Sequence, residues 1–509
     1  MSDSHSPLGC SSGSGWPRSP DPSCAPIRAV FADSQLTRRR VIGQFAALPI
    51  SVMALGAGSA LLAGCDGAAR SGTQREVSLW TLALSPFLDD YVRRQIASFE
   101  KTNPGVRVNW QDVPYEAIDR KLMAAAAAGR APDVINLADR TFARFVAMGA
   151  MRDLAPLLPP GALETYLPAA ARVGVIGGKQ LALPWYLTTQ AVLANKSVLA
   201  AGGISAEQLP TNWRDLLKMA GPFKKASGKP LFTLPLGFES DVPMMLLSDG
   251  ISPLVAGTDG WLIPQLTAPA VLRAIEPWVT AFRLGHLPRE SATGGSAHQT
   301  KLYSEGQVGL INSGPNFLGR IAADAPSIFA QTHVGPAITG MLGRVHLAVM
   351  TLGVTSQSRQ PELAAALAMH MTSPGAQLEL CRLATVLPST TASLSDVIFQ
   401  FEPEGDKLPG PEAGSSPQAI EQRVQYARAA CAAALDNAEA YTPSMASWPD
   451  MRRTFEDGFK RVLLDGSDLA LTMAGIERNW QSILSDNPAR ADALPPMVPL
   501  GAAKKDAAA

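Results

Sequence analysis

The sequence has few of the features that mark nucleic-acid-binding, zinc-binding or disulfide-rich proteins. Its 44 basic residues are balanced by 44 acidic ones, and no basic run follows the first forty residues. A nucleic-acid surface needs clustered Lys and Arg to displace counterions, so we expect no nucleic-acid partner. Only five cysteines occur, without a CxxC pair or close Cys/His spacing, which argues against a zinc site or a disulfide scaffold. If the chain is exported, Cys381 and Cys431 are either bridged or buried as free thiols.

Signatures of familiar enzymes are missing as well. The chain has no HExxH motif and no Walker A loop, and its six histidines lack metal-ligand spacing. A GxSxG string occurs at residues 9–13, but no strand precedes it and it lies in a Ser-rich leader. Paired carboxylates for glycoside cleavage are invisible in a sequence, so an exported hydrolase stays open as a lesser alternative. We expect a protein that is not an enzyme, without catalytic residues, a metal or a cofactor.

The features that are present begin with an export signal. Residues 1–37 are rich in Ser, Pro and Gly and have no apolar periodicity, which predicts a disordered region. Arg38 and Arg39 then precede an apolar stretch over residues 41–64, and a positive patch before an apolar segment orients a signal in the membrane. The paired arginines resemble the twin-arginine signal of proteins that are exported already folded.

A lipid-attachment site closes this segment. Residues 62–65 read Leu-Ala-Gly-Cys and resemble the lipobox of bacterial lipoproteins, in which the Cys65 thiol would accept diacylglycerol. The alternative is an uncleaved membrane span of about 20 residues, which leaves the placement of Leu-Ala-Gly-Cys unexplained. We therefore predict that residues 1–64 are a lipoprotein signal and that residues 65–75 are a tether.

Strands and helices alternate after the tether. Residues 76–82 alternate polar and apolar side chains and are rich in strand formers, and helical spacing of apolar residues follows over 88–99. A second strand is predicted at 106–110, an Ala-rich helix at 115–128 and a third strand at 133–137. This alternation implies right-handed crossovers and a mainly parallel sheet.

In such a sheet, ligands bind beyond the carboxyl ends of the strands. The residues at these ends are Trp80, Leu84 and Ser85 after the first strand, Asp112 after the second, and Asp139, Arg140 and Thr141 after the third. Trp80 also fits a place in the core, because it lies inside an apolar strand. Asp139 and Arg140 also fit a solvated ion pair, which would contribute little.

Several strings along the chain share their order and spacing with one protein family. They read Phe-Glu-Lys-Thr-Asn-Pro-Gly-Val-Arg-Val at 99–108, Gly-Arg-Ala-Pro-Asp-Val at 129–134, Leu-Pro-Trp-Tyr at 183–186, Asn-Lys at 195–196, Leu-Pro-Thr-Asn-Trp-Arg-Asp-Leu at 209–216, Gly-Gln-Val-Gly-Leu-Ile-Asn-Ser-Gly-Pro at 306–315 and Thr-Ser-Pro-Gly-Ala-Gln at 372–377. Together they resemble the family 1 extracellular solute-binding proteins, the sugar-binding subunits of ATP-binding-cassette importers. Ala194 and Asn316 depart from this family, which usually has aromatic residues there, so a long stacked oligosaccharide is less favoured.

The resemblance implies an α/β fold with two lobes, the type II-like periplasmic-binding-protein fold. Each lobe would be a mainly parallel sheet flanked by helices, and three crossovers between the lobes are expected near residues 188, 331 and 376. Lobe 1 would comprise 76–188 plus 332–375, and lobe 2 would comprise 189–331 plus 376–488. Residues 489–509 would form a disordered tail.

The resemblance also implies a ligand site between the lobes. Neutral sugars need planar hydrogen-bonding groups for their hydroxyls and aromatic rings for their apolar faces. The expected ligand-binding residues are Trp80, Ser85, Asp139, Arg140, Trp185, Tyr186, Glu239, Asp241, Asn312, Ser313 and Trp448. Trp448 fits a hydrophobic staple at a helix start as well. Four further tryptophans are assigned to packing, namely Trp213, Trp261, Trp278 and Trp480.

A protein of this family would deliver a mono- or oligosaccharide to the permease of an ATP-binding-cassette importer by closing its lobes on the ligand. We expect a monomer, held by its lipid anchor on the extracytoplasmic face of the cytoplasmic membrane. A non-sugar solute on the same scaffold stays open. An organic anion is one such solute, and a polyamine would use carboxylates such as Asp112, Asp139, Glu239 and Asp241. Ferric iron is disfavoured, because the chain has only seven tyrosines and no adjacent pair.

Overall fold

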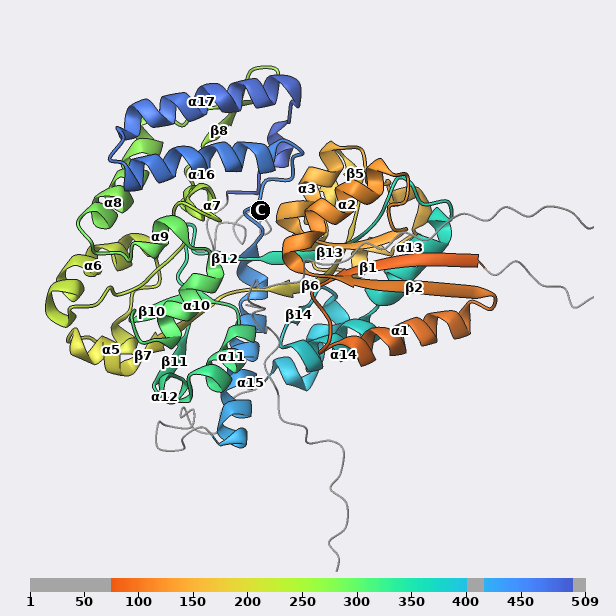
Figure 1. The fold of residues 1–509 in the computed structure, drawn as a ribbon, viewed down its shortest axis with the longest axis horizontal. Helices are drawn as coiled ribbons and strands as arrows, with labels where there is room; N and C mark the ends of the chain where they lie inside the picture. The colour runs from red at the N-terminus through yellow and green to blue at the C-terminus, as the bar shows by residue number, and fades with distance from the viewer. Residues whose placement is uncertain (1–74, 401–415, 498–509) are drawn as a thin grey trace, which may run out of the picture.

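Two α/β lobes stand side by side in the structure, a computed structural model (Figure 1). It describes residues 75–400 and 416–497. The predicted signal with Arg38 and Arg39, the lipidation site Cys65 and nearly all of the tether lie outside these residues. None of the described helices is long and apolar enough to cross a membrane. The two-lobe α/β arrangement confirms the predicted fold class.

The first lobe is built on a six-stranded sheet in the order β14-β6-β13-β3-β1-β2. Its strands are β1 (Arg75–Leu82), β2 (Val106–Val113), β3 (Val134–Ala138), β6 (Leu183–Thr188), β13 (Ala348–Val354) and β14 (Leu387–Pro388). β1 pairs in parallel with β2 and β3, whereas β13 runs antiparallel to β3 and β6. The predicted first three strands are confirmed. The flanking helices are α1 (Asp89–Thr102), α2 (Ile118–Ala127), α3 (Asp139–Ala147), α13 (Pro361–Met371) and α14 (Pro374–Ala384).

The alternation of side chains explains how α1 packs on this sheet. Val77 and Leu79 of β1 are fully buried, and Tyr91, Val92 and Phe99 of α1 belong to the same core. Burying a large apolar side chain contributes about 1.5–3 kcal/mol relative to leaving it in water. A strand period of two and a helix period of 3.6 therefore place both apolar faces against each other.

The second lobe has a smaller sheet in the order β10-β7-β11. β7 (Ala191–Asn195) lies in the middle and runs antiparallel to both β10 (Leu310–Ser313) and β11 (Thr332–Gly335). The prediction of a mainly parallel sheet is wrong for this lobe, and it holds only for β1, β2 and β3 of the first lobe, whose other pairings are antiparallel. β7 leads away from the first lobe, whereas β10 and β11 run the opposite way, so each neighbouring pair is antiparallel.

Helices surround the second sheet and carry most of this lobe's core. They are α5 (Lys196–Ala201), α6 (Trp213–Ser227), α7 (Val242–Ser248), α8 (Pro269–Arg283), α9 (Glu290–Thr293), α10 (Ser296–Ser304), α11 (Asn316–Asp324), α12 (Pro326–Ala330), α16 (Trp448–Leu464) and α17 (Leu469–Asp486). Asn212 caps α6, because its Oδ1 accepts from the Asp215 amide at 2.9 Å. Trp480 of α17 is fully buried in this core, as expected for a packing residue.

Three connections between the lobes can be followed in the described chain. The first, residues 189–190, joins β6 to β7 and lies close to the predicted crossover near 188. The second includes β12 (Val345–His346), which pairs in parallel with β15 (Ala438–Glu439) of the third. The predicted crossover near 331 is wrong, because β11 pairs with β7 and keeps residues 332–335 in the second lobe.

The third connection runs through α15 (Pro417–Ala433) to β15. The predicted crossover near 376 is wrong, because α14 stays packed on the first lobe. The Tyr91 hydroxyl donates to the Ala376 carbonyl oxygen at 3.1 Å, and Arg94 forms an ion pair with Glu379 at 2.8 Å. β14 then pairs with β6, so the segment through β14 belongs to the first lobe.

Part of the predicted disordered tail packs on the second lobe. The Arg490 guanidinium lies 4.6 Å from the centre of the Trp261 ring, and the Ser444 amide donates to the Ala493 carbonyl oxygen at 2.8 Å. The tail prediction is therefore wrong for residues 489–497. Trp261 keeps 38 % of its surface exposed and serves this contact rather than the core.

The two cysteines of the described body, Cys381 and Cys431, are buried and free. Burial raises the pKa of the Cys431 thiol to about 11 and raises the pKa of the Cys381 thiol still more strongly. Both thiols are therefore protonated at neutral pH and act as small apolar side chains.

Candidate functional site

A pocket opens beside the connections between the lobes. It is lined by Gln190, Trp213, Thr233, Asp241, Met244, Met245, Ser248, Asn312, Ile338, Thr339, Gly340, Arg344, His346 and Tyr441. Its space free of atoms is about 560 Å³, which includes open solvent at the mouth. Small-molecule sites combine apolar walls with a few placed polar groups, and this lining has both.

Each of the three connections sends a side chain to this pocket. Gln190 lies in the first connection, His346 belongs to β12 in the second, and Tyr441 follows β15 in the third. Most of the remaining wall comes from α7 and from residues 338–340 of the second lobe, and β10 and the start of α6 give one residue each. A molecule bound here would touch all three segments that must bend when the lobes move.

Asn312, a predicted ligand residue, lines the pocket but is held by the protein. Its Nδ2 donates to Gln190 Oε1 at 2.7 Å and to the Ile338 carbonyl oxygen at 3.1 Å. Its Oδ1 accepts from the Ile338 amide at 3.1 Å. These bonds tie β10 to the neighbouring wall and orient Gln190. Asp241, also predicted, stands immediately before α7 in the same lining.

The aromatic part of the wall consists of Trp213, His346 and Tyr441. The His346 and Tyr441 rings stack with centroids 6.4 Å apart and an interplanar angle of 20°. The Trp213 ring meets Trp278 edge-on at 6.4 Å, which fixes its orientation. Burial, and next the Glu439 carboxylate, raise the pKa of Tyr441 to about 12, so its hydroxyl is protonated at neutral pH.

Two charged side chains of opposite sign, Asp241 and Arg344, belong to this lining. Their formal charges cancel. His346 is the only other lining residue whose side chain has a basic nitrogen. Among residues 75–400 and 416–497, no group of three or more His, Cys, Asp and Glu is arranged to hold a metal ion. The pocket thus offers hydrogen bonds and ring faces without a net charge.

Asp139 lies where the two lobes meet. It is the first residue of α3, is 7 % exposed, and its Oδ2 accepts from Thr442 Oγ1 of the second lobe at 3.4 Å. The same Thr442 hydroxyl lies 3.8 Å from the sulfur of Met244, which lines the pocket. The structure therefore brings Asp139 to the edge of the pocket. Arg140 follows it in α3.

Internal hydrogen bonds occupy the other strand ends of the first lobe. Asp112, at the end of β2, accepts from Thr81 Oγ1 at 2.7 Å and from the amides of Leu84 and Ser85 at 3.1 Å. Ser85 Oγ donates to Asp89 Oδ1 at 2.6 Å. Asp112 and Ser85 therefore hold the loop between β1 and α1 in place.

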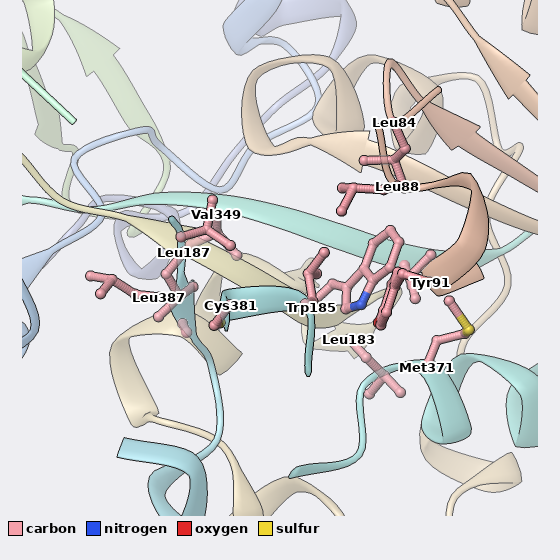
Figure 2. Close-up of a cluster of buried hydrophobic side chains, with 14 of the residues drawn as sticks. Leu84, Leu88, Tyr91, Leu183, Trp185, Leu187, Val349, Met371, Cys381 and Leu387 are labelled. Carbon is pink, nitrogen blue, oxygen red and sulfur yellow. The ribbon is translucent and has the colours of Figure 1, made fainter. Parts of the chain in front are cut away.

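The tryptophans predicted to stack on a ligand are packing residues. Trp185 is 0 % exposed and lies beside Tyr91 and Leu183 in the hydrophobic core that includes β1 and α1 (Figure 2). Trp448 is 2 % exposed and meets Trp480 edge-on at 5.9 Å. Neither ring has a free face, so both assignments are corrected to packing. Trp80 is partly buried in the core beneath α2, as the alternative interpretation expected.

Tyr186, Glu239 and Ser313 lie outside the pocket lining. Tyr186 packs edge-on against Trp185 at 5.4 Å, and burial raises the pKa of its hydroxyl. Glu239 Oε2 accepts from the Ser296 amide at 3.1 Å and so fixes the start of α10. Ser313 ends β10 and is partly buried opposite Ala191. The structure does not bring these three predicted residues together.

Sequence reasoning missed several pocket residues, among them Trp213, Arg344 and Tyr441. Trp213 begins a capped helix, which favours packing, and it does pack while one side lines the pocket. Arg344 and Tyr441 flank β12 and β15, strands of two residues each. Strands so short carry no periodic pattern, so the sequence contains no signal for these two residues.

A family model described as "Bacterial extracellular solute-binding protein" matches residues 83–378. Among solved structures, the chain is similar to a protein of Synechococcus sp. MITs9220, provisionally described as an oligosaccharide periplasmic-binding protein and crystallised in complex with zinc. The two share 29 % sequence identity and superpose with a TM-score of 0.72, over 81 % of this chain and 99 % of that chain.

Two sequence relatives extend the comparison. An uncharacterized lipoprotein of Streptomyces antibioticus is 24 % identical over 344 residues, which cover 66 % of this chain and 75 % of the relative. The diacetylchitobiose binding protein DasA of Streptomyces coelicolor is 25 % identical over 253 residues, 48 % of this chain and 56 % of the relative. Since the family model spans more than half of the chain, this protein belongs to the bacterial extracellular solute-binding proteins.

Proposed function

We propose that this protein binds a neutral sugar in the pocket beside the lobe connections and delivers it to the permease of an ATP-binding-cassette importer. The wall of that pocket carries the proposal. The partly buried Trp213 offers a ring face for the apolar side of a sugar, and Gln190 is a hydrogen-bonding side chain of the kind that sugar hydroxyls need. The names of the Synechococcus protein and of DasA, which refer to oligosaccharide and diacetylchitobiose, agree with this proposal.

Charge favours a sugar over the alternatives. A polyamine would require an excess of carboxylates in the wall, and an organic anion would require an excess of basic groups. Asp241 and Arg344 instead balance each other. Of the other carboxylates considered for a polyamine, Asp112 and Glu239 are occupied by bonds to backbone amides.

Closure of the lobes is the proposed working step. A ligand that contacts both lobes stabilises the closed form relative to the open one. The contact between Asp139 and Thr442 at 3.4 Å supports this, because it brings a polar side chain of the first lobe to the edge of a pocket in the second. The cycle requires no chemistry on the ligand, so we propose a binding protein without catalytic activity.

A thermal-shift panel tests the proposed ligand class on protein that begins after Cys65. The panel contains maltose, N,N′-diacetylchitobiose and glucose, with spermidine and citrate as the rival classes. A ligand at a hundred times its dissociation constant adds about 2.7 kcal/mol to the free energy of unfolding, which raises the melting temperature. We expect a rise with at least one sugar. A rise with spermidine or citrate alone would overturn the sugar proposal.

We further propose twin-arginine export and a lipid anchor at Cys65, on the extracytoplasmic face of the cytoplasmic membrane. Arg38, Arg39 and the Leu-Ala-Gly-Cys string support this, as does the lipoprotein name of the Streptomyces antibioticus relative. Cys65→Ala removes the thiol that accepts the lipid, so we expect the protein to move from the membrane fraction to the soluble fraction. Palmitate labelling of the variant would contradict the anchor.

A further inference from the structure

Tyr441 combines properties that a packing role does not explain. Its side chain lines the pocket and is 1 % exposed. Its hydroxyl makes no hydrogen bond with any of the described residues. Buried polar groups are paired as a rule, so an unpaired hydroxyl in the wall of a pocket calls for a partner from outside the protein.

Other buried tyrosines of the described chain show the usual arrangement. The hydroxyl of Tyr166 lies 2.6 Å from Thr372 Oγ1, and the hydroxyl of Tyr303 lies 2.8 Å from Thr332 Oγ1. Both tyrosines lie outside the pocket lining. The unpaired hydroxyl thus occurs at a tyrosine that faces the candidate ligand site.

The surroundings of Tyr441 hold its ring in a fixed position. The His346 ring stacks on it, and the residues before it form β15, which pairs with β12. The hydroxyl is protonated at neutral pH, because burial raises its pKa to about 12, and so it can donate. A hydroxyl held in this way selects for an acceptor at one place in the ligand.

We propose that Tyr441 is a ligand-binding and specificity-determining residue, whose hydroxyl donates a hydrogen bond to a hydroxyl oxygen of the bound sugar at the connection between the lobes. This inference rests on the proposed function for the identity of the ligand as a sugar. Because Tyr441 follows β15, the bond ties the ligand to the third connection and favours one arrangement of the lobes.

Two matched variants separate ligand binding from packing. Tyr441→Phe removes only a hydroxyl that has no partner among the described residues, so the melting temperature of the ligand-free protein should stay unchanged. Its affinity for the sugar that gives the largest thermal shift should fall by about tenfold in calorimetric titration. Tyr303→Phe, the control, removes a paired hydroxyl outside the pocket, so it should lower the melting temperature and leave the affinity unchanged.

Two results would overturn the role of Tyr441 whatever the ligand is. One is an unchanged affinity in Tyr441→Phe. The other is a ligand-free melting temperature that falls as far in Tyr441→Phe as in Tyr303→Phe, because that fall would mean that the hydroxyl is satisfied within the protein. The second measurement needs no ligand and therefore remains informative if the whole sugar panel fails.

Mass spectrometry of molecules retained during purification separates failure of this inference from failure of the proposed function. The full-length lipoprotein and both variants are purified without added ligand, and the molecules released by denaturation are identified. A non-sugar lost from Tyr441→Phe but kept by Tyr303→Phe would overturn the sugar proposal and support the role of Tyr441. A sugar kept equally by both variants would support the sugar proposal and overturn the role of Tyr441.

Discussion

Similar side chains have different roles in the first lobe and in the wall of the pocket. In the first lobe, Asp112 accepts bonds from a side chain and from backbone amides, and Trp185 is fully buried. Trp213 of the second lobe and Tyr441 of the third connection instead line a pocket, and the Tyr441 hydroxyl has no partner among the described residues. A place at a strand end therefore does not make a ligand site. What matters is whether the hydrogen-bonding capacity and the ring faces are already used within the protein.

The largest effect is expected from Trp185→Ala in the first lobe. Removing a fully buried indole leaves a cavity, so the free energy of unfolding in urea should fall by about 3–5 kcal/mol. The affinity of the folded protein for its sugar should not change. Trp185→Phe, which keeps part of the ring volume, is the control and should lose less. If Trp185→Ala kept its stability and bound the sugar weakly, Trp185 would be a ligand residue and not a packing residue.

A smaller loss is expected from Asp112→Ala. The substitution deprives Thr81 and the amides of Leu84 and Ser85 of their acceptor, so the free energy of unfolding should fall by about 1–3 kcal/mol. Asp112→Asn keeps one acceptor oxygen and should be milder. Loss of sugar affinity without loss of stability would return Asp112 to the ligand site.

Trp213→Ala tests the second lobe. Loss of the ring face should weaken sugar binding by about tenfold, or about 1.4 kcal/mol, in calorimetric titration. Trp261→Ala is the matched control, because that ring packs on Arg490 outside the pocket lining. Equal affinities of the two variants would contradict the assignment of the pocket.

The smallest effect concerns acid. Burial lowers the pKa of His370 in the first lobe and of His333 in the second below the ordinary value of 6.5. A histidine kept neutral by folding contributes stability above pH 6.5, and that contribution is lost as the pH falls through the folded-state pKa. The melting temperature should therefore drop below about pH 6.5, and less so in His370→Gln and His333→Gln. Identical pH profiles of the variants and the wild type would exclude this source of acid sensitivity.

Local features were predictable where they rest on periodicity or capping. The alternation at 76–82 and the helical spacing at 88–99 correspond to β1 and α1, because both patterns reflect one buried face. The crossovers near 331 and 376 were misplaced, because they depend on β11 pairing with β7 and on β14 pairing with β6. Such long-range pairings leave no local trace.

The candidate site was less predictable than the fold. Asp241 and Asn312 were found and line the pocket, and Asp139 lies at its edge. Trp185 was misassigned, because a sequence does not show that a strand is covered on both faces. Tyr441 was missed, since its position depends on how two distant connections come together.

The place of β13 in the first sheet sets the order in which the polypeptide can be completed. This strand lies between β3 and β6 in the sheet. The ribosome nevertheless makes residues 189–347 after β6 and before β13. On the ribosome, the amino-terminal half-sheet must therefore wait on the order of ten seconds for its central strand, at translation rates of about 5–20 residues per second. By then most of the neighbouring lobe has emerged, and no single cut in the polypeptide would release either lobe whole.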